Sequence, residues 1–443
     1  MGIWTRGTAE VYSLPAPEFF ARHRPGRASA LETARVTSLP LPDDLLAPDA
    51  VADPHAFFRR LREHSPLHWS ERHKAWLVTS HAEVRAALRD PRLSTARMDA
   101  FESRLSAARR AALAPALELL RGWMLFHDPP EHTRLRTPVA RAFSPRRVER
   151  MQADIERVVA ELLDEVGRAG GGDLVQAFAH PLPAIVIGEL FGVPRADREK
   201  IRHWSAKFGV VVFGAVERPD YEQVAHEAGV ELRDYVAWLV AERRREGSSR
   251  DDLLGALLQT CGRPEGLRED EIAGACSLLL FAGHDTTASL IASSALALLR
   301  DARQRAQLPV EPDDAVCAVE ELLRFEGPAK IMMRRALVSH ERAGQTVEAG
   351  QQIFLALPSA NRDPEVFARP DALDLARSPN PHLAFGEGIH FCLGSSLARL
   401  EARIALTRLF ARFPRLTLAS EEIGWRRTIS DRSLLSLLVT TGT

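Results

Sequence analysis

One cysteine of the chain lies in a glycine-rich segment whose residue types suit the ligation of a metal. The segment reads Phe385-Gly386-Glu387-Gly388-Ile389-His390-Phe391-Cys392-Leu393-Gly394. Its three glycines permit a tight turn and a close approach of the backbone to a flat ligand. Backbone N–H groups beside the sulfur, and a helix beginning behind it in the apolar pattern of residues 397–409, would stabilise a thiolate. The segment therefore predicts a loop that offers the thiolate of Cys392 to a haem iron.

The alternative for a single cysteine beside a glycine-rich turn is a buried structural residue. The full string Phe-Gly-x-Gly-x-His-x-Cys-x-Gly is much rarer than such a turn, and it resembles the cysteine-ligand loop of the cytochrome P-450 family. The resemblance implies heme b (iron protoporphyrin IX) with Cys392 as the axial ligand of the iron. A thiolate ligand pushes electron density onto the iron and favours O–O cleavage. Further residues that the resemblance places around the cofactor are Phe385, Gly386, His390 and Gly394.

A second motif, Ala282-Gly283-His284-Asp285-Thr286-Thr287, lies in the middle of the longest helical pattern. Glycine and adjacent threonines are poor helix formers, so we expect a kink or a close approach there. If the motif stood alone, the favoured explanation would be small residues packed against a neighbouring element. Beside the Cys392 loop it resembles the acid–alcohol pair of the family. The resemblance implies that Asp285 relays protons, that Thr286 hydrogen-bonds iron-bound dioxygen or its water, and that Ala282 and Gly283 lie against the haem.

Four basic residues are predicted partners of the two haem propionates. His132 and Arg136 are four residues apart and share a helix face, and arginine binds a carboxylate with two hydrogen bonds. Arg334 and His390 complete the resemblance to the family's propionate ligands, with Arg335 as the alternative to Arg334 because the strand register is open. Each residue by itself is equally well explained as an ordinary solvated cation. The four together favour the propionate role because all of them fall where the family places them.

Glu321 and Arg324 are spaced i,i+3 on one predicted helix. A pair at this spacing is ordinarily a weak surface contact. The resemblance instead makes the two residues a buried structural pair, completed by an arginine from a later segment, for which Arg377 is the candidate. These residues would hold the scaffold of the cofactor and perform no chemistry.

The composition is that of an ordinary soluble globular protein, with 45% hydrophobic and 26% charged residues among 443. The 58 Lys and Arg balance 59 Asp and Glu, so we expect no nucleic-acid or membrane partner. The four cysteines show no zinc or covalent-haem spacing, and the first 20 residues contain no apolar signal segment. These features predict a cytoplasmic protein, which we expect to be a monomer.

Residues 1–45 are rich in Pro, Arg and Ala, show weak periodicity and are predicted to be an irregular leader. The rest, 46–443, is predicted to be one haem-thiolate monooxygenase domain, mainly α with a small β portion. The resemblance places the haem between the long central helix and the helix after the Cys392 loop. Hydrophobic periodicity predicts helices at 57–64, 82–88, 106–120, 132–143, 145–166, 195–213, 221–245, 269–299 and 316–325, and strands at 67–69, 75–78, 335–338, 351–357 and 435–440.

The implied reaction inserts one oxygen atom of O2 into a hydrophobic small molecule, by hydroxylation or epoxidation. The chain has no flavin or nicotinamide fingerprint, so its electrons are expected from a ferredoxin or flavodoxin with its reductase. One alternative is a peroxide-driven peroxygenase, which the pair Asp285-Thr286 disfavours. Another is a non-catalytic haem-thiolate binding or sensor protein, which would leave that pair without a purpose. A carrier-protein-dependent oxidase of the family would share all these motifs.

The predicted walls of the substrate pocket are largely apolar and favour a terpenoid, steroid, fatty acid or polyketide. They are residues 98–120, 208–216, 279–282, 329–333 and 430–434. Lys330 is expected to face solvent at a strand edge, with contact to an acidic substrate group as the alternative. Candidate contacts for an acidic electron carrier, or else ordinary surface residues, are Arg134, Arg141, Arg399 and Arg403.

Overall fold

Helices dominate the part of the chain that the structure describes, and this confirms the predicted mainly α class with a small β portion. The computed structural model describes residues 41, 43–197, 200, 203–204, 207–208, 220–247, 252–263 and 265–442. One compact unit spans Asp43–Thr443. Most of the predicted leader 1–45, most of the later part of the predicted helix 195–213 and most of the predicted pocket wall 208–216 lie outside the described residues. The last residues assigned to the leader, 43–45, belong to the compact unit, and Leu45 is buried.

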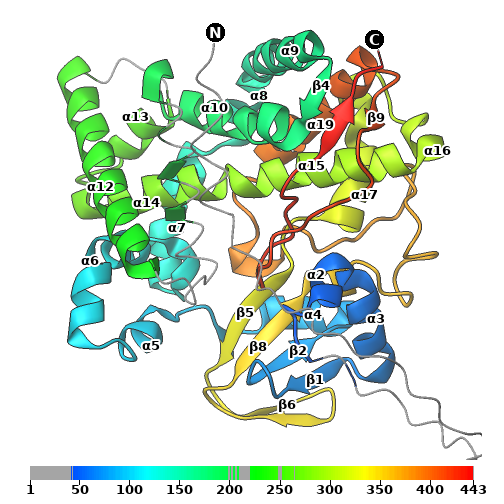
Figure 1. The fold of residues 1–443 in the computed structure, drawn as a ribbon. Coiled ribbons are helices and arrows are strands. Elements are labelled where there is room, and N and C mark those ends of the chain that lie inside the picture. The colour runs from blue at the N-terminus through cyan, green and yellow to red at the C-terminus, as the bar shows by residue number, and fades with distance from the viewer. Residues whose placement is uncertain are drawn as a thin grey trace, which may run out of the picture. The chain divides into compact units, whose positions relative to one another are not determined.

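The helices and strands follow one another in the order seen in Figure 1. The helices are α2 (Pro48–Ala52), α3 (Pro54–His64), α4 (His81–Arg89), α5 (Met98–Glu102), α6 (Ala107–Arg121), α7 (Glu131–Ala142), α8 (Pro145–Arg150), α9 (Gln152–Ala169), α10 (Pro181–Leu190), α12 (Tyr221–Glu246), α13 (Leu253–Leu258), α14 (Glu269–Ala282), α15 (Asp285–Arg300), α16 (Ala302–Arg305), α17 (Val316–Glu326), α18 (Leu357–Ala360) and α19 (Ser395–Arg412). The strands are β1 (Leu67–Ser70), β2 (Ala75–Val78), β3 (Leu93–Ser94), β4 (Gly171–Asp173), β5 (Ile331–Ala336), β6 (His340–Arg342), β7 (Gln345–Val347), β8 (Gln352–Ala356), β9 (Thr417–Leu418) and β10 (Leu438–Thr440).

The largest sheet has five strands in the order β1-β2-β8-β5-β3. The predicted hairpin of β1 and β2 is present, and β2 pairs in parallel with β8 although the two are far apart in the chain. Strand β5 begins at Ile331, so the prediction of a strand starting at residue 335 was wrong. The apolar run Ile331–Met333 pairs with β8, which places Arg334 opposite Ile353 within the ladder.

The long apolar pattern of residues 269–299 forms two helices that run end to end through the helical part in Figure 1. Helix α14 ends at Ala282 and α15 begins at Asp285, so the helix is interrupted where the glycine and the threonines follow one another. A Cβ atom on Gly283 would lie 3.2 Å from Cδ1 of Ile187 in α10, so the glycine permits close approach of these helices. The 32 residues Glu269–Arg300 are long and apolar enough to cross a membrane, but 83% of their most apolar window is buried inside the protein. They are therefore its central core helix.

Helix α10 was not predicted from the sequence. Its residues Pro181–Leu190 are apolar on all sides and buried almost throughout, so they show no helical alternation of apolar and polar positions. Its prolines lie in the first turn, where the missing N–H groups cost nothing. The predicted helix 145–166 is instead two helices, α8 and α9, because the chain turns at Met151.

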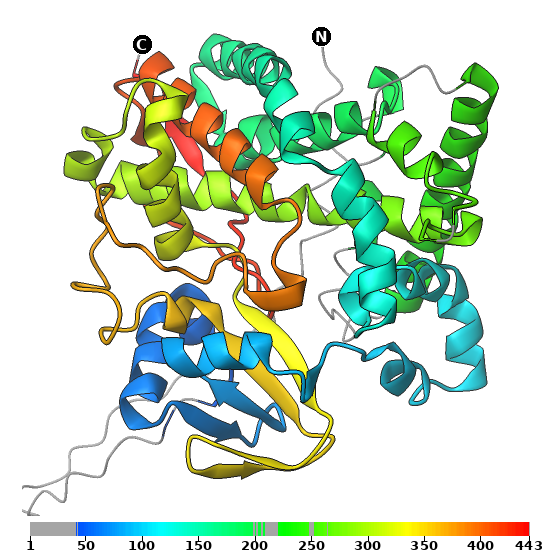
Figure 2. The same cartoon turned by 180° about the vertical axis from the view of Figure 1, so that it is seen from behind.

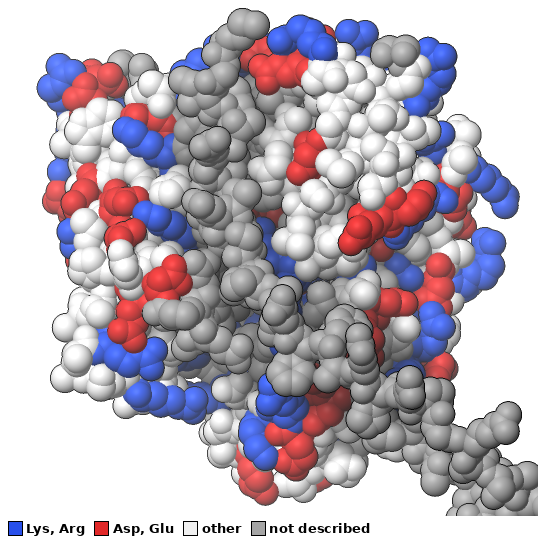
Figure 3. Space-filling model, viewed as in Figure 1, with Lys and Arg blue, Asp and Glu red and all other residues white. Residues whose placement is uncertain are grey.

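The segment that carries Cys392 passes between the five-stranded sheet and the helical part, as seen from behind in Figure 2. Its short 3-10 turn, Gly388–His390, contacts α4, and the chain then enters α19. Helix α19 packs against α15, α9 and α17. On the face drawn in Figure 3, Lys and Arg are interspersed with Asp and Glu, as the balanced composition predicts.

Candidate active site

The loop around Cys392 turns tightly at two of its three glycines. Gly386 and Gly388 have φ of 68° and 77°, a region that favours glycine. The backbone N–H of Cys392 donates to the carbonyl of Phe385 at 3.0 Å and closes the loop. Gly394 has an ordinary φ of −81° and is the N-cap of α19, and its N–H donates to the Cys392 sulfur. The sulfur thus lies before a helix N-terminus, which favours a thiolate.

Burial raises the pKa of the Cys392 thiol, against the opposing effects of the Gly394 N–H and of Arg136 and Arg399. A metal cation on the sulfur would supply the missing positive charge, so the donor set fits a thiolate-bound iron. Arg399 is fixed beside the loop, because it donates to Glu320 at 2.6 and 2.9 Å and lies 4.5 Å from the ring centroid of Phe385.

Replacing Gly388 by alanine is expected to destabilise the loop. The new Cβ would lie 2.9 Å from the carbonyl oxygen of Leu88 in α4 at a φ of 77°, so clash and backbone strain add up. We expect the free energy of unfolding in urea to fall by about 2–3 kcal/mol. The matched control is Gly344→Ala, which has a φ of 73° but nothing within 4 Å, and should cost about 1 kcal/mol. Equal losses in the two variants would show that contact with α4 contributes nothing.

Four basic side chains from three separate segments, α7, β5 and the Cys392 loop itself, meet beside the loop. The rings of His132 and His390 have centroids 4.2 Å apart, and Arg136 donates to the Phe391 carbonyl at 2.6 Å. His132 is 2% exposed, yet neither of its ring nitrogens has a hydrogen-bond partner among the described residues. Arg334 is also buried and donates only to its neighbour Met333 within the described chain. Groups of this kind require an acceptor from outside the chain.

The electrostatics of this cluster indicate a missing negative charge. Burial, together with the nearby His132, Arg334 and Arg136, lowers the pKa of His390 to about 3. Burial also lowers the pKa of Arg334 to about 10, against the single nearby carboxylate of Asp128. Two haem propionates would bring two negative charges to four chargeable groups, so the cluster fits the cofactor.

Arg97 is a further member of the cluster that the sequence did not reveal. It is half-buried, and its guanidinium lies 4.6 Å from the ring centroid of Phe126. Burial and the neighbouring Arg334 lower its pKa to about 10, and it has no acidic partner among the described residues. No motif surrounds this arginine, and only its position after β3 shows that it faces Arg334. Arg335, the alternative to Arg334, points to the opposite face of β5.

Lys330 is buried and not solvent-exposed, so this prediction was wrong. Its side chain is 4% exposed because the segment 425–434 covers it, and its ammonium group donates to the Thr428 carbonyl. Burial lowers its pKa to about 8, against the raising effect of Asp431. The sequence places Lys330 directly before a strand, and only the long-range contact with the later segment buries it.

Asp285 and Thr286 begin α15 and point into different surroundings. The Thr286 hydroxyl donates to the Ala282 carbonyl at 2.9 Å, which leaves its lone pairs free to accept a further hydrogen bond. Ala282 is exposed on this side of the helix. Asp285 is buried and accepts from Arg426 at 3.1 Å. Burial would raise the pKa of Asp285, but Arg426, His284 and His180 outweigh it and hold the pKa below its usual value.

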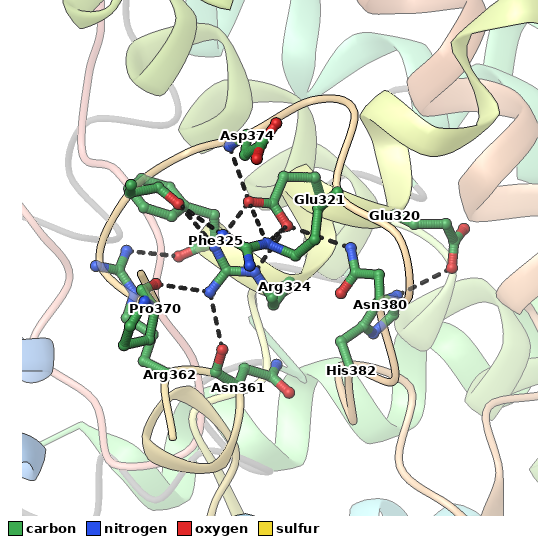
Figure 4. Close-up of polar contacts among 12 residues, drawn as sticks. Glu320, Glu321, Arg324, Phe325, Asn361, Arg362, Pro370, Asp374, Asn380 and His382 are labelled. Carbon is green, nitrogen blue, oxygen red and sulfur yellow. Dashed lines mark hydrogen bonds and ion pairs between the residues drawn. The ribbon is translucent and has the colours of Figure 1, made fainter. Parts of the chain in front are cut away.

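Glu321 and Arg324 lie at the centre of a buried polar network, drawn in Figure 4. Arg324 makes two hydrogen bonds of 2.7 Å to the Glu321 carboxylate. The candidate third member, Arg377, donates to the same carboxylate at 3.0 and 3.1 Å. Arg324 also donates to three carbonyls of later loops, those of Asn361, Pro370 and Ala372. The network ties α17 to the chain that leads to the Cys392 loop.

The four arginines considered as contacts for an electron carrier all have acidic partners within the chain. Arg134 pairs with Glu131 and Glu271, and Arg399 pairs with Glu320. The two looser pairs are Arg141–Glu265 at 3.5 Å and Arg403–Asp313 at 3.6 Å. Each arginine is therefore at least partly neutralised before any partner arrives.

Comparison with known proteins agrees with this geometry. A family model described as cytochrome P-450 matches residues 108–423. The chain is 42% identical over 370 residues to nocardicin C N-oxygenase of Nocardia uniformis subsp. tsuyamanensis, covering 82% of this chain and 89% of the relative. It is 37% identical over 367 residues to 6-deoxyerythronolide B hydroxylase of Saccharopolyspora erythraea, covering 81% of this chain and 88% of the relative.

Solved structures give the same result. The structure of P450BioI in complex with acyl carrier protein carrying hexadec-9Z-enoic acid superposes with a TM-score of 0.81 at 36% identity, covering 89% of this chain and 100% of the other. The structure of CalO2 superposes with a TM-score of 0.81 at 32% identity, covering 90% and 98%. The chain belongs to the cytochrome P-450 family and is a haem-thiolate monooxygenase of the soluble bacterial type.

Proposed function

We propose that this enzyme hydroxylates or epoxidises a hydrophobic small molecule, with heme b bound through Cys392. The observation that carries the proposal is the pair Asp285–Thr286, placed at the interruption of the core helix that packs against the helix of the Cys392 loop. A protein that only bound or sensed a ligand would not need a buried acid beside a hydroxyl at this position.

Each residue of the site has a stated task in this proposal. Cys392 ligates the iron, and the partners of the propionates are His132, Arg136, Arg334 and His390. When bound, haem supplies the redox chemistry that activates oxygen. The Thr286 hydroxyl donates its hydrogen to the Ala282 carbonyl, so its oxygen accepts a hydrogen bond from a water held at this place. Asp285 delivers protons to that place, while Ala282 and Gly283 keep the helix backbone accessible.

The electrons are proposed to come from a ferredoxin or flavodoxin with its reductase, because the chain contains no flavin or nicotinamide motif of its own. Ile389 and Phe391 are 50% and 40% exposed in the Cys392 loop and offer an apolar patch next to Arg136. We further propose that the protein acts as a cytoplasmic monomer of one domain, with residues 1–45 as an irregular leader.

The substrate class rests on the apolar character of the predicted pocket walls. The relatives described above are named for nocardicin C and for 6-deoxyerythronolide B, and one of the similar structures contains hexadec-9Z-enoic acid attached to an acyl carrier protein. We therefore propose that the substrate is a hydrophobic natural product or lipid, either free or attached to a carrier. The first experiment is a screen of such compounds for those that shift the spin state of the haem on binding.

Replacing Thr286 by valine is expected to uncouple electron consumption from product formation. The change keeps the shape of the side chain and removes the hydroxyl to which the proposal assigns the holding of a water beside the reaction site. Haem binding should persist, while product formed per NADH consumed should fall by roughly tenfold or more and hydrogen peroxide should rise. The measurement is a reconstituted assay with a surrogate ferredoxin and reductase and a compound that shifts the spin state.

Thr287→Val is the matched control, because Thr287 is buried on another side of the same turn. This variant should form as much product per NADH consumed as the wild type. Full coupling in Thr286→Val would overturn the role of the hydroxyl. Turnover driven by hydrogen peroxide alone, with none from the reductase system, would favour the peroxygenase, and no turnover in either system would favour a sensor.

A further inference from the structure

Two histidines lie against the buried carboxylate of Asp285. Nδ1 of His284 is 3.7 Å and Nδ1 of His180 is 3.9 Å from the same oxygen, Oδ1 of Asp285. The two rings meet edge to face, with centroids 5.3 Å apart. His284 precedes Asp285 in the chain, whereas His180 comes from the junction of the π-turn Val175–Ala179 with α10.

The hydrogen bonds of His284 determine where its proton lies. Its Nε2 is 3.2 Å from the carbonyl oxygen of His180. A carbonyl can only accept, so this nitrogen carries the hydrogen. Nδ1 of His284 then faces Asp285 with a lone pair, unless a second proton is present. The contact between Nδ1 of His284 and the Asp285 carboxylate is therefore favourable only when one of the two groups holds an additional proton.

The other oxygen of Asp285 is engaged elsewhere. Oδ2 accepts from Arg426 at 3.1 Å, and Arg426 is also 3.8 Å from the carboxylate of Asp431. Ser433 donates to Asp431 at 2.6 Å and shares a hydrogen bond of 2.8 Å with Ser289. This network fixes one side of the carboxylate and leaves Oδ1 facing the histidines. It also disfavours a divalent cation between His180, His284 and Asp285, because the guanidinium already lies against the same carboxylate.

The three side chains differ in solvent exposure, and the difference indicates from which side protons enter the cluster. The side chain of His180 is 13% exposed, whereas those of His284 and Asp285 are 1% and 5% exposed. Asp285 is ionised at neutral pH, since its pKa lies below its usual value, so it requires a donor before it can deliver a proton. Histidine is the side chain suited to gain and lose protons near neutral pH. Among the described residues, the other charged groups that face the cluster are Arg426 and Asp431.

We propose that His180 is the solvent-side donor that loads Asp285 with protons, with His284 holding a shared proton beside it. In each cycle the Nδ1 proton of His180 passes to Oδ1 of Asp285, directly or through one water. His180 then takes a proton from solvent, and Asp285 passes its own proton toward Thr286. His180 acts through Asp285 and is a positioning residue, and the inference rests on the proposed role of Asp285.

The first test measures the coupling of the two groups without turnover. Histidine signals of the diamagnetic carbon monoxide complex are titrated by NMR, with the His180 signal assigned by its loss in His180→Gln. In Asp285→Asn, which retains the shape of the side chain, the titration midpoint of His180 should move down by roughly one pH unit. An unchanged midpoint would overturn the coupling of the two groups.

The second test is the pH profile of turnover in the reconstituted system. The wild-type rate should fall as rising pH removes the histidine proton. In His180→Gln the rate at neutral pH should be roughly tenfold lower and nearly independent of pH, with KM unchanged. His64→Gln, the same change at an exposed position of α3, should retain the wild-type profile.

The outcomes separate this inference from the proposed function. If Asp285→Asn forms as much product per NADH consumed as the wild type, the role of Asp285 itself is overturned. An impaired Asp285→Asn beside a His180→Gln with the wild-type profile would overturn only the role of His180. Loss of activity on treatment with a chelator, with recovery on addition of zinc, would replace the proton route by a metal site.

Discussion

Replacement of Cys392 by alanine should abolish the strongly red-shifted Soret band that the dithionite-reduced protein shows under carbon monoxide. The band reports a thiolate on the iron, and no other cysteine can supply it, because Cys276 is buried in the core and Cys261 and Cys317 lie in separate segments. Oxygenase turnover should fall by more than about 1000-fold, since the electron donation that favours O–O cleavage is lost. The measurement is the carbon monoxide difference spectrum, followed by turnover with the best ligand of the screen.

Cys317→Ala is the matched control, because it makes the same chemical change at an exposed position. It should retain both the band and the turnover. Haem can remain in Cys392→Ala through the basic cluster around His132 and Arg334, which gives a spectrum without the red shift. A thiolate-type band that persists in Cys392→Ala would show that Cys392 is not the ligand.

Replacement of Arg324 by methionine should cause the largest loss of stability of any single change considered. Arg324 and Glu321 are fully buried. The variant therefore leaves a carboxylate whose remaining partners among the described residues are Arg377, Asn380 and the Asp374 N–H. It also leaves three carbonyls of later loops without their donor. Breaking a buried pair in this way costs about 3–5 kcal/mol. Urea unfolding of the purified protein measures the loss, and the carbon monoxide spectrum reports whether the Cys392 loop is still held.

Arg157→Met is the control, since Arg157 pairs with Glu189 and Glu161 at the surface. An exposed network of this kind is worth about 0–1 kcal/mol. A similar small loss in Arg324→Met would mean that the buried pair adds little stability beyond what an apolar side chain of that length provides. Restoration of stability by Arg324→Lys would show that charge alone suffices, whereas the geometry requires the guanidinium, with its five N–H donors.

Much of the helical architecture was predictable because the apolar residues of an amphipathic helix recur in the sequence with the period of the helix. The predictions for α3, α4, α6, α7 and α17 agree with the structure to within a few residues. Helix α10 was not predictable in this way, since an element buried on all sides has no polar face to set a period. The start of β5 was misjudged because strand pairing depends on β8, which follows later in the chain.

The sequence by itself determined the chemistry of the site: a cysteine in a glycine-rich loop, an acid beside an alcohol in a long apolar helix, and a Glu–Arg pair. These signals are local, since each is made by residues a few positions apart whose backbone conformation follows from their own types. Only the tertiary structure decided which distant residues meet: Arg97 with Arg334, Lys330 with the segment around Thr428, and His180 with Asp285. Contacts of this kind arise from the packing of whole elements. The residues next to a single arginine or histidine in the sequence do not indicate which distant residue it will contact.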